Sequence, residues 1–258
     1  MYNIYGTSVE NKSEVFEMKI IADTHTHTIA STHAFSTVQE MVRAASEKEL
    51  FAIALTDHGY NMPGSPKEGE WFFECLGAIP AYLYDVRVLK GVEANVSDYN
   101  GNLDIPEDTL KKLEWTVASM HSITISGEAN IESCTNAWLS IAENPYVNVI
   151  GHSGTPCFKY DYEKVIPIFG KNGKLIEINN NTFKSRKSSM GNCAEIAKIC
   201  KKTNTRIIVN SDAHFSTAVG VFDSVLEMLK DIDFPEHLVV NSSIENFKDY
   251  LKEQGIYY

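Results

Sequence analysis

The chain has 258 residues, of which 43% are hydrophobic and 22% are charged, and its formal net charge is −11. These values predict a globular protein with a sizeable core, and the acidic balance disfavours broad, salt-dependent binding to nucleic acid. No apolar run approaches the roughly 18 residues that a membrane span needs, so we expect no membrane partner.

The N-terminal segment and the cysteines indicate the domain organisation of the chain and its cellular compartment. Residues 1–17 lack the apolar stretch of a secretory signal, and we expect an N-terminal extension followed by one folded domain at residues 18–258. The five cysteines form an odd set without a Cys-x-x-Cys pair. That usage is typical of reduced thiols and predicts a cytoplasmic protein. A homo-oligomer is left open.

Short apolar runs alternate with amphipathic helical patterns along most of the chain. Runs rich in Ile, Val and Leu predict strands buried on both faces, which we expect at residues 18–23, 51–56, 86–92, 114–119, 147–151, 174–178 and 206–210. Apolar stripes at helical spacing predict helices at residues 37–48, 71–83, 135–142, 162–169, 192–202, 221–232 and 244–253. The alternation indicates parallel βαβ units in one α/β domain, and this number of units favours a closed, TIM-like barrel.

The segment Asp23-Thr24-His25-Thr26-His27 follows the first expected strand, and His33 lies in the loop after it. Histidines at alternate positions of an extended chain point to the same side. His25 and His27 can therefore chelate one metal ion.

Further polar residues stand where the later strands end. They are His58 in Thr56-Asp57-His58-Gly59, Glu93, His121, His152 after Gly151, and Asp212 and His214 in Ser211-Asp212-Ala213-His214. The carboxyl ends of parallel barrel strands open on one face, which is where active sites are built. Of the eight histidines in the chain, only His237 lies away from these strand ends and the first loop.

Imidazoles and carboxylates gathered on one rim indicate metal ions. A single histidine is more often a core or surface residue, but burying this whole set without partners would be costly. Neutral imidazole and carboxylate are standard zinc ligands, and the set exceeds what one tetrahedral ion needs. It suffices for three ions if one carboxylate bridges two of them.

These motifs resemble those of the PHP (polymerase and histidinol phosphatase) family. The resemblance runs in order from Asp23-x-His25-x-His27 to Ser211-Asp212-Ala213-His214 and covers roughly residues 20–247. Residues 28–37 and 177–187 are similar to the small stand-alone, YcdX-like phosphatase branch. The N-terminal extension falls outside the resemblance.

The resemblance implies a distorted (βα)7 barrel with a trinuclear metal centre, most commonly of zinc, with manganese or iron as alternatives. It implies one ion held by His25, His27, Glu93 and Asp212, a second held by Glu93, His121 and His152, and a third held by His33, His58 and His214. Asp23 and Asp57 match motif members that do not ligate. We expect each of them to orient a ligand imidazole by a hydrogen bond to the ring nitrogen that does not face the metal. The alternative is that each carboxylate bonds only backbone.

Ions with these ligands would leave a positive rim that attracts a small dianion. We therefore expect a metal-dependent hydrolase of small phosphate monoesters, in which a metal-bound hydroxide attacks phosphorus. Arg186, flanked by Lys184 and Lys187, is the candidate phosphate clamp, with a solvated basic loop as the alternative. His214, Asp57 or a metal-bound water could protonate the leaving group.

Two alternative functions would use the same metal site. A histidinol-phosphatase or nuclease-like phosphodiesterase activity is one, although the acidic balance argues against a processive nuclease. A non-catalytic metal-binding module is another, but structural zinc sites are usually closed and rich in cysteine. Residues 179–181, which are asparagines at the end of the sixth expected strand, either line the pocket or cap the next turn.

Overall fold

The computed structural model describes residues 18–185 and 187–257. Its framework is a curved parallel sheet in the order β1-β2-β4-β5-β6-β7-β8, with the short β3 antiparallel to β4. The strands are β1 (Ala22–Thr26), β2 (Ala52–Leu55), β3 (Tyr82–Leu83), β4 (Val86–Asn95), β5 (Trp115–Ser119), β6 (Val149–Ile150), β7 (Leu175–Asn179) and β8 (Ile207–Asn210). Nearly all residues of the parallel strands are buried, which explains their uninterrupted apolar runs.

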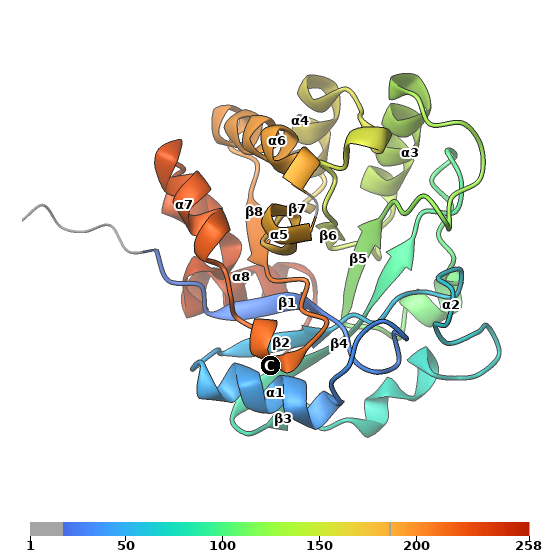
Figure 1. The fold of residues 1–258 in the computed structure, drawn as a ribbon, viewed down its shortest axis with the longest axis vertical. Helices are drawn as coiled ribbons and strands as arrows, with labels where there is room; N and C mark the ends of the chain where they lie inside the picture. Colours follow the sequence, from blue (N-terminus) through green and yellow to red (C-terminus); the bar gives the residue numbers. More distant parts are fainter. Residues whose placement is uncertain (1–17, 186, 258) are drawn as a thin grey trace, which may run out of the picture.

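Helices pack around this sheet, most of them on its outer face. They are α1 (Val38–Glu47), α2 (Glu107–Leu110), α3 (Ile131–Glu143), α4 (Tyr162–Lys171), α5 (Asn181–Ser185), α6 (Met190–Thr203), α7 (Asp223–Asp231) and α8 (Ile244–Glu253). α1 packs on β2 and β4, while α3, α4 and α6 lie side by side along the other half of the barrel (Figure 1). The expected single α/β domain with a distorted TIM-like barrel is confirmed. Within the described residues, no helix combines the length and apolar character needed to cross a bilayer.

The barrel is distorted where its two end strands, β1 and β8, meet. There asparagine side chains replace part of a backbone ladder. Asn210 Oδ1 accepts from Thr24 N at 2.8 Å, and Asn241 Nδ2 donates to Ala22 O at 2.8 Å and Val209 O at 2.6 Å. These bonds satisfy strand-edge groups that would otherwise be buried without partners.

The N-terminal end of the barrel is closed by α8. Phe247 and Tyr250 of this helix pack against Trp115 at the start of β5, with ring centroids 6.1 and 6.0 Å away. The Tyr250 hydroxyl donates to Asn148 O and Gly173 O, so its polar end is also satisfied. With this end filled by apolar side chains, the opposite end of the barrel is left for the polar residues.

The expected helix at residues 71–83 is wrong. The segment forms only a 3-10 helix, η1 (Phe73–Ala78), followed by β3, which turns back into β4. Pro80 interrupts any helix, and Tyr84 and Asp85 take left-handed backbone angles, φ 52° and 63°, in the turn. The other expected helices are present, and the side chains of Thr37 and Ser243 cap the N-termini of α1 and α8.

Candidate metal centre

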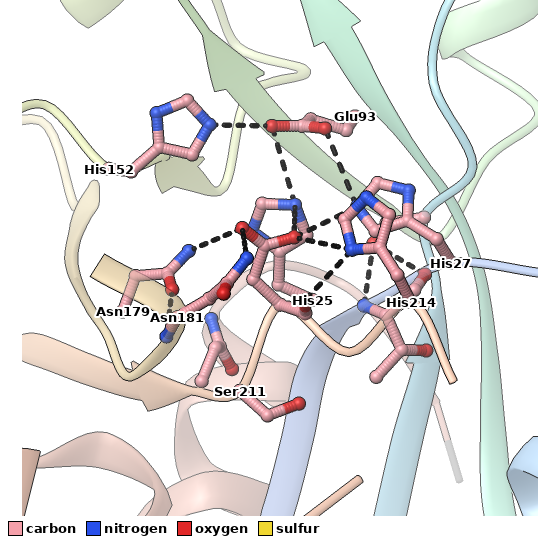
Figure 2. A network of polar contacts seen from close by, with 12 residues as sticks. His25, His27, Glu93, His152, Asn179, Asn181, Ser211 and His214 are labelled. Atoms are coloured by element: carbon pink, nitrogen blue, oxygen red, sulfur yellow. Dashed lines mark hydrogen bonds and ion pairs between the residues drawn. The ribbon is translucent and has the colours of Figure 1, made fainter. Parts of the chain in front are cut away.

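The candidate ligands come together at the carboxyl ends of the strands, and Figure 2 shows His25, His27, Glu93, His152 and His214 among them. β1 supplies His25, His27 follows directly after this strand, and β4 supplies Glu93. The others stand in the loops that follow β1, β2, β5, β6 and β8, and they are His33, His58, His121, His152, Asp212 and His214. The structure thus brings every residue of the expected ligand set to one place.

Glu93 lies at the centre of the cluster. Its Oε1 is 2.9 Å from His152 Nε2 and 3.4 Å from both His25 Nε2 and His121 Nε2. Its Oε2 is 2.6 Å from His58 Nδ1 and 3.6 Å from His27 Nε2. One carboxylate therefore faces five imidazoles from four strand ends, which is the arrangement that a bridging ligand needs.

Asp212 and His33 complete the other side. Asp212 Oδ1 lies 3.2 Å from His27 Nε2 and 3.8 Å from His25 Nε2. The Nε2 atoms of His33 and His58 are 3.0 Å apart, and the His33 ring centroid is 4.9 Å from that of His214. The histidines and acids form one continuous cluster rather than separate pairs.

The donor atoms fit metal ions. Five buried atoms of the cluster make no well-directed hydrogen bond in the described part of the chain, although several of them lie close to one another. They are His25 Nε2, His27 Nε2, His58 Nδ1, His121 Nε2 and Glu93 Oε2. Leaving such atoms unpaired costs free energy, whereas each is an ordinary ligand atom for a divalent ion.

Three ligand groups of suitable spacing occur among the described residues: His25, His27 and Glu93; His58, Glu93 and His121; and His27, His58 and His214. The first group agrees with the expected first ion. His58 belongs to both of the others, although the family resemblance assigns it to the third ion alone.

The electrostatics of the cluster are coupled. Burial alone would raise the pKa of the Glu93 carboxyl, but the rings of His25, His58 and His121 outweigh burial and hold this pKa well below its usual range. Burial and the neighbouring His58 lower the pKa of His27 well below its usual value. Both shifts favour an ionised Glu93 and a neutral His27, which are the forms that bind metal.

Two of the ligand positions have unusual backbone. His152 and Asp212 take positive φ angles of 23° and 54°, which are uncommon for residues other than glycine. The preceding Gly151 is also constrained, because a Cβ there would lie 2.2 Å from Ser119 Oγ. Such local strain is concentrated at functional sites, and here it aims two side chains at Glu93 and His27.

The imidazoles are oriented by residues other than those we expected. Glu177 Oε1 accepts from His25 Nδ1 at 2.7 Å, and Glu177 Oε2 accepts from His152 N at 2.8 Å. Asn95 Oδ1 accepts from His121 Nδ1 at 2.8 Å. These contacts fix the tautomers so that Nε2 of His25 and of His121 faces Glu93.

The expectation that Asp23 orients an imidazole is wrong. Its carboxylate accepts from Ser211 N at 3.0 Å, from Ser211 Oγ and from Gly220 N at 2.9 Å, and so secures the loop that carries the Ser-Asp-Ala-His motif. Burial raises the pKa of Asp23 to about 6.

Asp57 acts on the cluster only indirectly. It accepts from Thr28 N, from Thr28 Oγ1 and from Ser31 Oγ, at 2.7 to 2.8 Å. Ser31 Oγ in turn accepts from His58 N at 3.1 Å and lies 3.4 Å from His27 Nδ1. Burial raises the pKa of Asp57.

The remaining predicted site residues lie around the rim. Arg186 is outside the described residues. Lys184 lines a cavity of about 260 Å³ beside His214, and Asn181 lines the same cavity. Asn179 caps the next turn by accepting from Asn181 N at 2.8 Å, and it also donates to Asp212 Oδ2 at 3.1 Å. Asn180 and Asn181 are the asparagines that line this cavity.

Known proteins resemble this chain in sequence and in fold. A family model described as PHP domain matches residues 23–181. A protein of Acetivibrio thermocellus named "Probable phosphatase" is 48% identical over 237 residues, which are 92% of this chain and 97% of that protein. A "Probable phosphatase" of Thermoanaerobacter sp. is 45% identical over 238 residues, again 92% of this chain and 96% of the relative.

Among solved structures, histidinol phosphate phosphatase from Lactococcus lactis, in complex with zinc, L-histidinol and phosphate, has a TM-score of 0.53. It shares 15% identity, and the similarity covers 92% of this chain and 94% of that one. At this identity the likeness concerns the fold alone.

Proposed function

Because the chain belongs to the PHP domain family, we propose that it hydrolyses small phosphate monoesters at the cluster around Glu93, with divalent metal ions as cofactors. Its phosphatase relatives place it among the phosphoesterase hydrolases. The observation that carries the proposal is the set of five buried ligand atoms that make no well-directed hydrogen bond in the described structure.

We assign the metal ligands as the family resemblance implies. One ion takes His25, His27, Glu93 and Asp212, a second takes Glu93, His121 and His152, and a third takes His33, His58 and His214. Zinc is the first candidate, with manganese or iron as alternatives. Bound ions would supply Lewis acidity, which makes water acidic enough to ionise near neutral pH and offsets the charge of a phosphoryl group.

The protein groups then have distinct tasks. Glu177 and Asn95 hold the rings of His25 and His121, which keeps the ligand geometry fixed before substrate arrives. His214, at the rim, can ligate an ion or protonate the leaving oxygen, but one nitrogen cannot do both. The bonds that Asp57 accepts from Thr28 and Ser31 support a positioning role over proton transfer.

Basic residues beyond β7 are the proposed binding site for the phosphoryl oxygens. Lys184 lines the small cavity next to His214 and supplies a positive charge there. Arg186 follows two residues later, and its guanidinium would match two phosphoryl oxygens at once. Replacing Arg186 with Ala should raise KM for a phosphate monoester several-fold, and an unchanged KM would remove it from the site.

A side-by-side assay tests the proposed reaction. The metal-loaded chain should hydrolyse p-nitrophenyl phosphate. Histidinol phosphate and a short oligonucleotide are assayed separately under the same conditions, to distinguish the alternative activities. Chelation of the metal should abolish the activity, as should Glu93→Gln, whereas the exposed Glu163→Gln should not change it. A chain that holds its full metal content and cleaves none of these phosphoesters would instead support a non-catalytic metal-binding module.

A further inference from the structure

A second cavity opens beside the cluster, on a different side from Lys184. It has a volume of about 460 Å³, and His33, His121 and His152 form part of its wall. This size is typical of small-molecule pockets. Because three of the proposed metal ligands line it, a group bound there would lie next to the reacting phosphorus if the proposed function holds, and the inference below rests on that function.

The rest of the wall is largely apolar. Met62, Met120 and Phe158 are buried side chains that face the cavity, and Ile123 stands exposed at its edge. The hydroxyl of Thr155, another lining residue, already donates to His152 O at 3.0 Å. None of the described residues that line this cavity carries a carboxylate, an ammonium or a guanidinium group.

This composition discriminates between substrates by charge. An ammonium group placed here would lose water and find no carboxylate among the described lining residues, which is costly. An apolar group would gain from burial against Met62, Met120 and Phe158.

The two cavities also give the ester an orientation. Lys184 and Asn181 lie on one side of His214 and suit the phosphoryl oxygens, while the thioethers and the phenyl ring lie on the side of His33 and His121. We propose that the apolar cavity receives the leaving group, and that the substrates are phosphate monoesters of uncharged, largely apolar alcohols rather than of amino alcohols.

A pair of nearly isosteric esters tests the proposal. n-Propyl phosphate and O-phosphoethanolamine differ mainly by a terminal methyl in place of an ammonium. The metal-loaded protein should show a kcat/KM at least about tenfold higher for the propyl ester, since burying a charged group without a partner costs free energy. Equal values, or a preference for O-phosphoethanolamine, would overturn the proposal.

A charge introduced at the cavity edge should change the preference. Ile123→Glu places a carboxylate beside the leaving group at a position that is 66% exposed, so the fold should tolerate it. The ratio of the two kcat/KM values should fall about fivefold, as expected for one partly exposed ion pair. Ile244→Glu, at another exposed isoleucine in α8, should leave the ratio unchanged. An equal change in both variants would contradict the assignment.

A binding measurement tests this inference independently of the proposed phosphatase activity. If neither ester is hydrolysed, the proposed phosphatase activity fails, yet the cavity can still be judged with non-hydrolysable phosphonates. By calorimetry, n-butylphosphonate should bind at least about fivefold more tightly than 3-aminopropylphosphonate, and Ile123→Glu should narrow that difference. Equal affinities would overturn the cavity assignment whatever the catalytic result.

Discussion

Glu177 is the residue whose substitution tests the architecture of the site most sharply. It is buried on β7 and receives four hydrogen bonds, two at each carboxylate oxygen. The donors are His25 Nδ1 and Asn210 Nδ2 on Oε1, and His152 N and Asn179 Nδ2 on Oε2. Glu177→Gln keeps the size of the side chain but replaces one acceptor with an amide that donates.

Either orientation of the new amide is unfavourable. If the NH2 group faces His152, it opposes the backbone N–H there. If it faces His25, the ring must accept at Nδ1 and carry its proton on Nε2, the atom that faces Glu93. A hydrogen bond to a charged group contributes about 1.5–3 kcal/mol, and residues that orient metal ligands typically change metal affinity about 10–100-fold.

The assay is a zinc titration against a chromophoric chelator, together with the kinetics of p-nitrophenyl phosphate hydrolysis. Glu177→Gln should weaken the tightest zinc site at least about tenfold and lower kcat, while excess zinc restores part of the activity. Glu163→Gln, an exposed carboxylate that pairs with Lys202 at 3.3 Å, serves as the control and should behave like the wild type. Zinc affinity and kcat for Glu177→Gln within twofold of the wild-type values would refute the role of Glu177 in positioning His25.

Three further predictions concern substrate binding, the core and pH. Lys184→Ala should raise KM several-fold with little change in kcat, because an exposed cation beside the cluster aids phosphate binding in the ground state; steady-state kinetics would contradict this if only kcat fell. Trp138→Ala should lower the free energy of unfolding in urea titrations by about 3–5 kcal/mol, since Trp138 of α3 is 1% exposed and packs against Phe169 of α4. Trp71→Ala, at a position that is 71% exposed, should change it by less than about 0.5 kcal/mol. Burial lowers the pKa of Lys174 from 10.5 to about 8, so the unfolded chain binds the proton more tightly across that window. Stability should therefore rise with pH from about 8 to 10.5, by at most about 3 kcal/mol, which solvent screening of the ammonium reduces. The rise should be absent from Lys174→Met, and equal pH profiles for the two proteins would show that Lys174 does not titrate in this way.

The sequence predicts the barrel well because two features of the chain are local: the apolar run of each strand and the polar residue that follows it. Strands buried on both faces read as short apolar runs, and in a parallel sheet the polar residue after each run lies on the same face as the others. The clustering of His58, His121 and His152 around Glu93 therefore follows from their positions in the chain once the strands are known.

The connection between β2 and β4 could not be predicted in the same way. Phe72, Phe73, Leu76 and Ile79 have helical spacing, but Pro80 and the left-handed turn that follows it convert the end of the segment into a hairpin. That turn lacks the Asn-Gly signal of tight hairpins, so spacing alone favoured the longer helix.

The supporting residues of the site were harder to find because side-chain partners are not local. Asp23 and Asp57 stand next to ligands in sequence, yet their hydrogen bonds go to Ser211, Gly220, Thr28 and Ser31. A signal for Glu177 was present. It is an acid within the apolar strand Leu175–Asn179, where burial without a partner would be costly.

The most direct test of the whole account is the metal content of the purified chain, measured by elemental analysis before and after dialysis against a chelator, with hydrolysis of p-nitrophenyl phosphate followed in parallel. The account predicts three tightly bound divalent ions per chain, loss of activity as they are removed, and recovery when zinc, manganese or iron is restored. A purified chain that takes up none of these ions, or that hydrolyses the ester equally well without them, would contradict it.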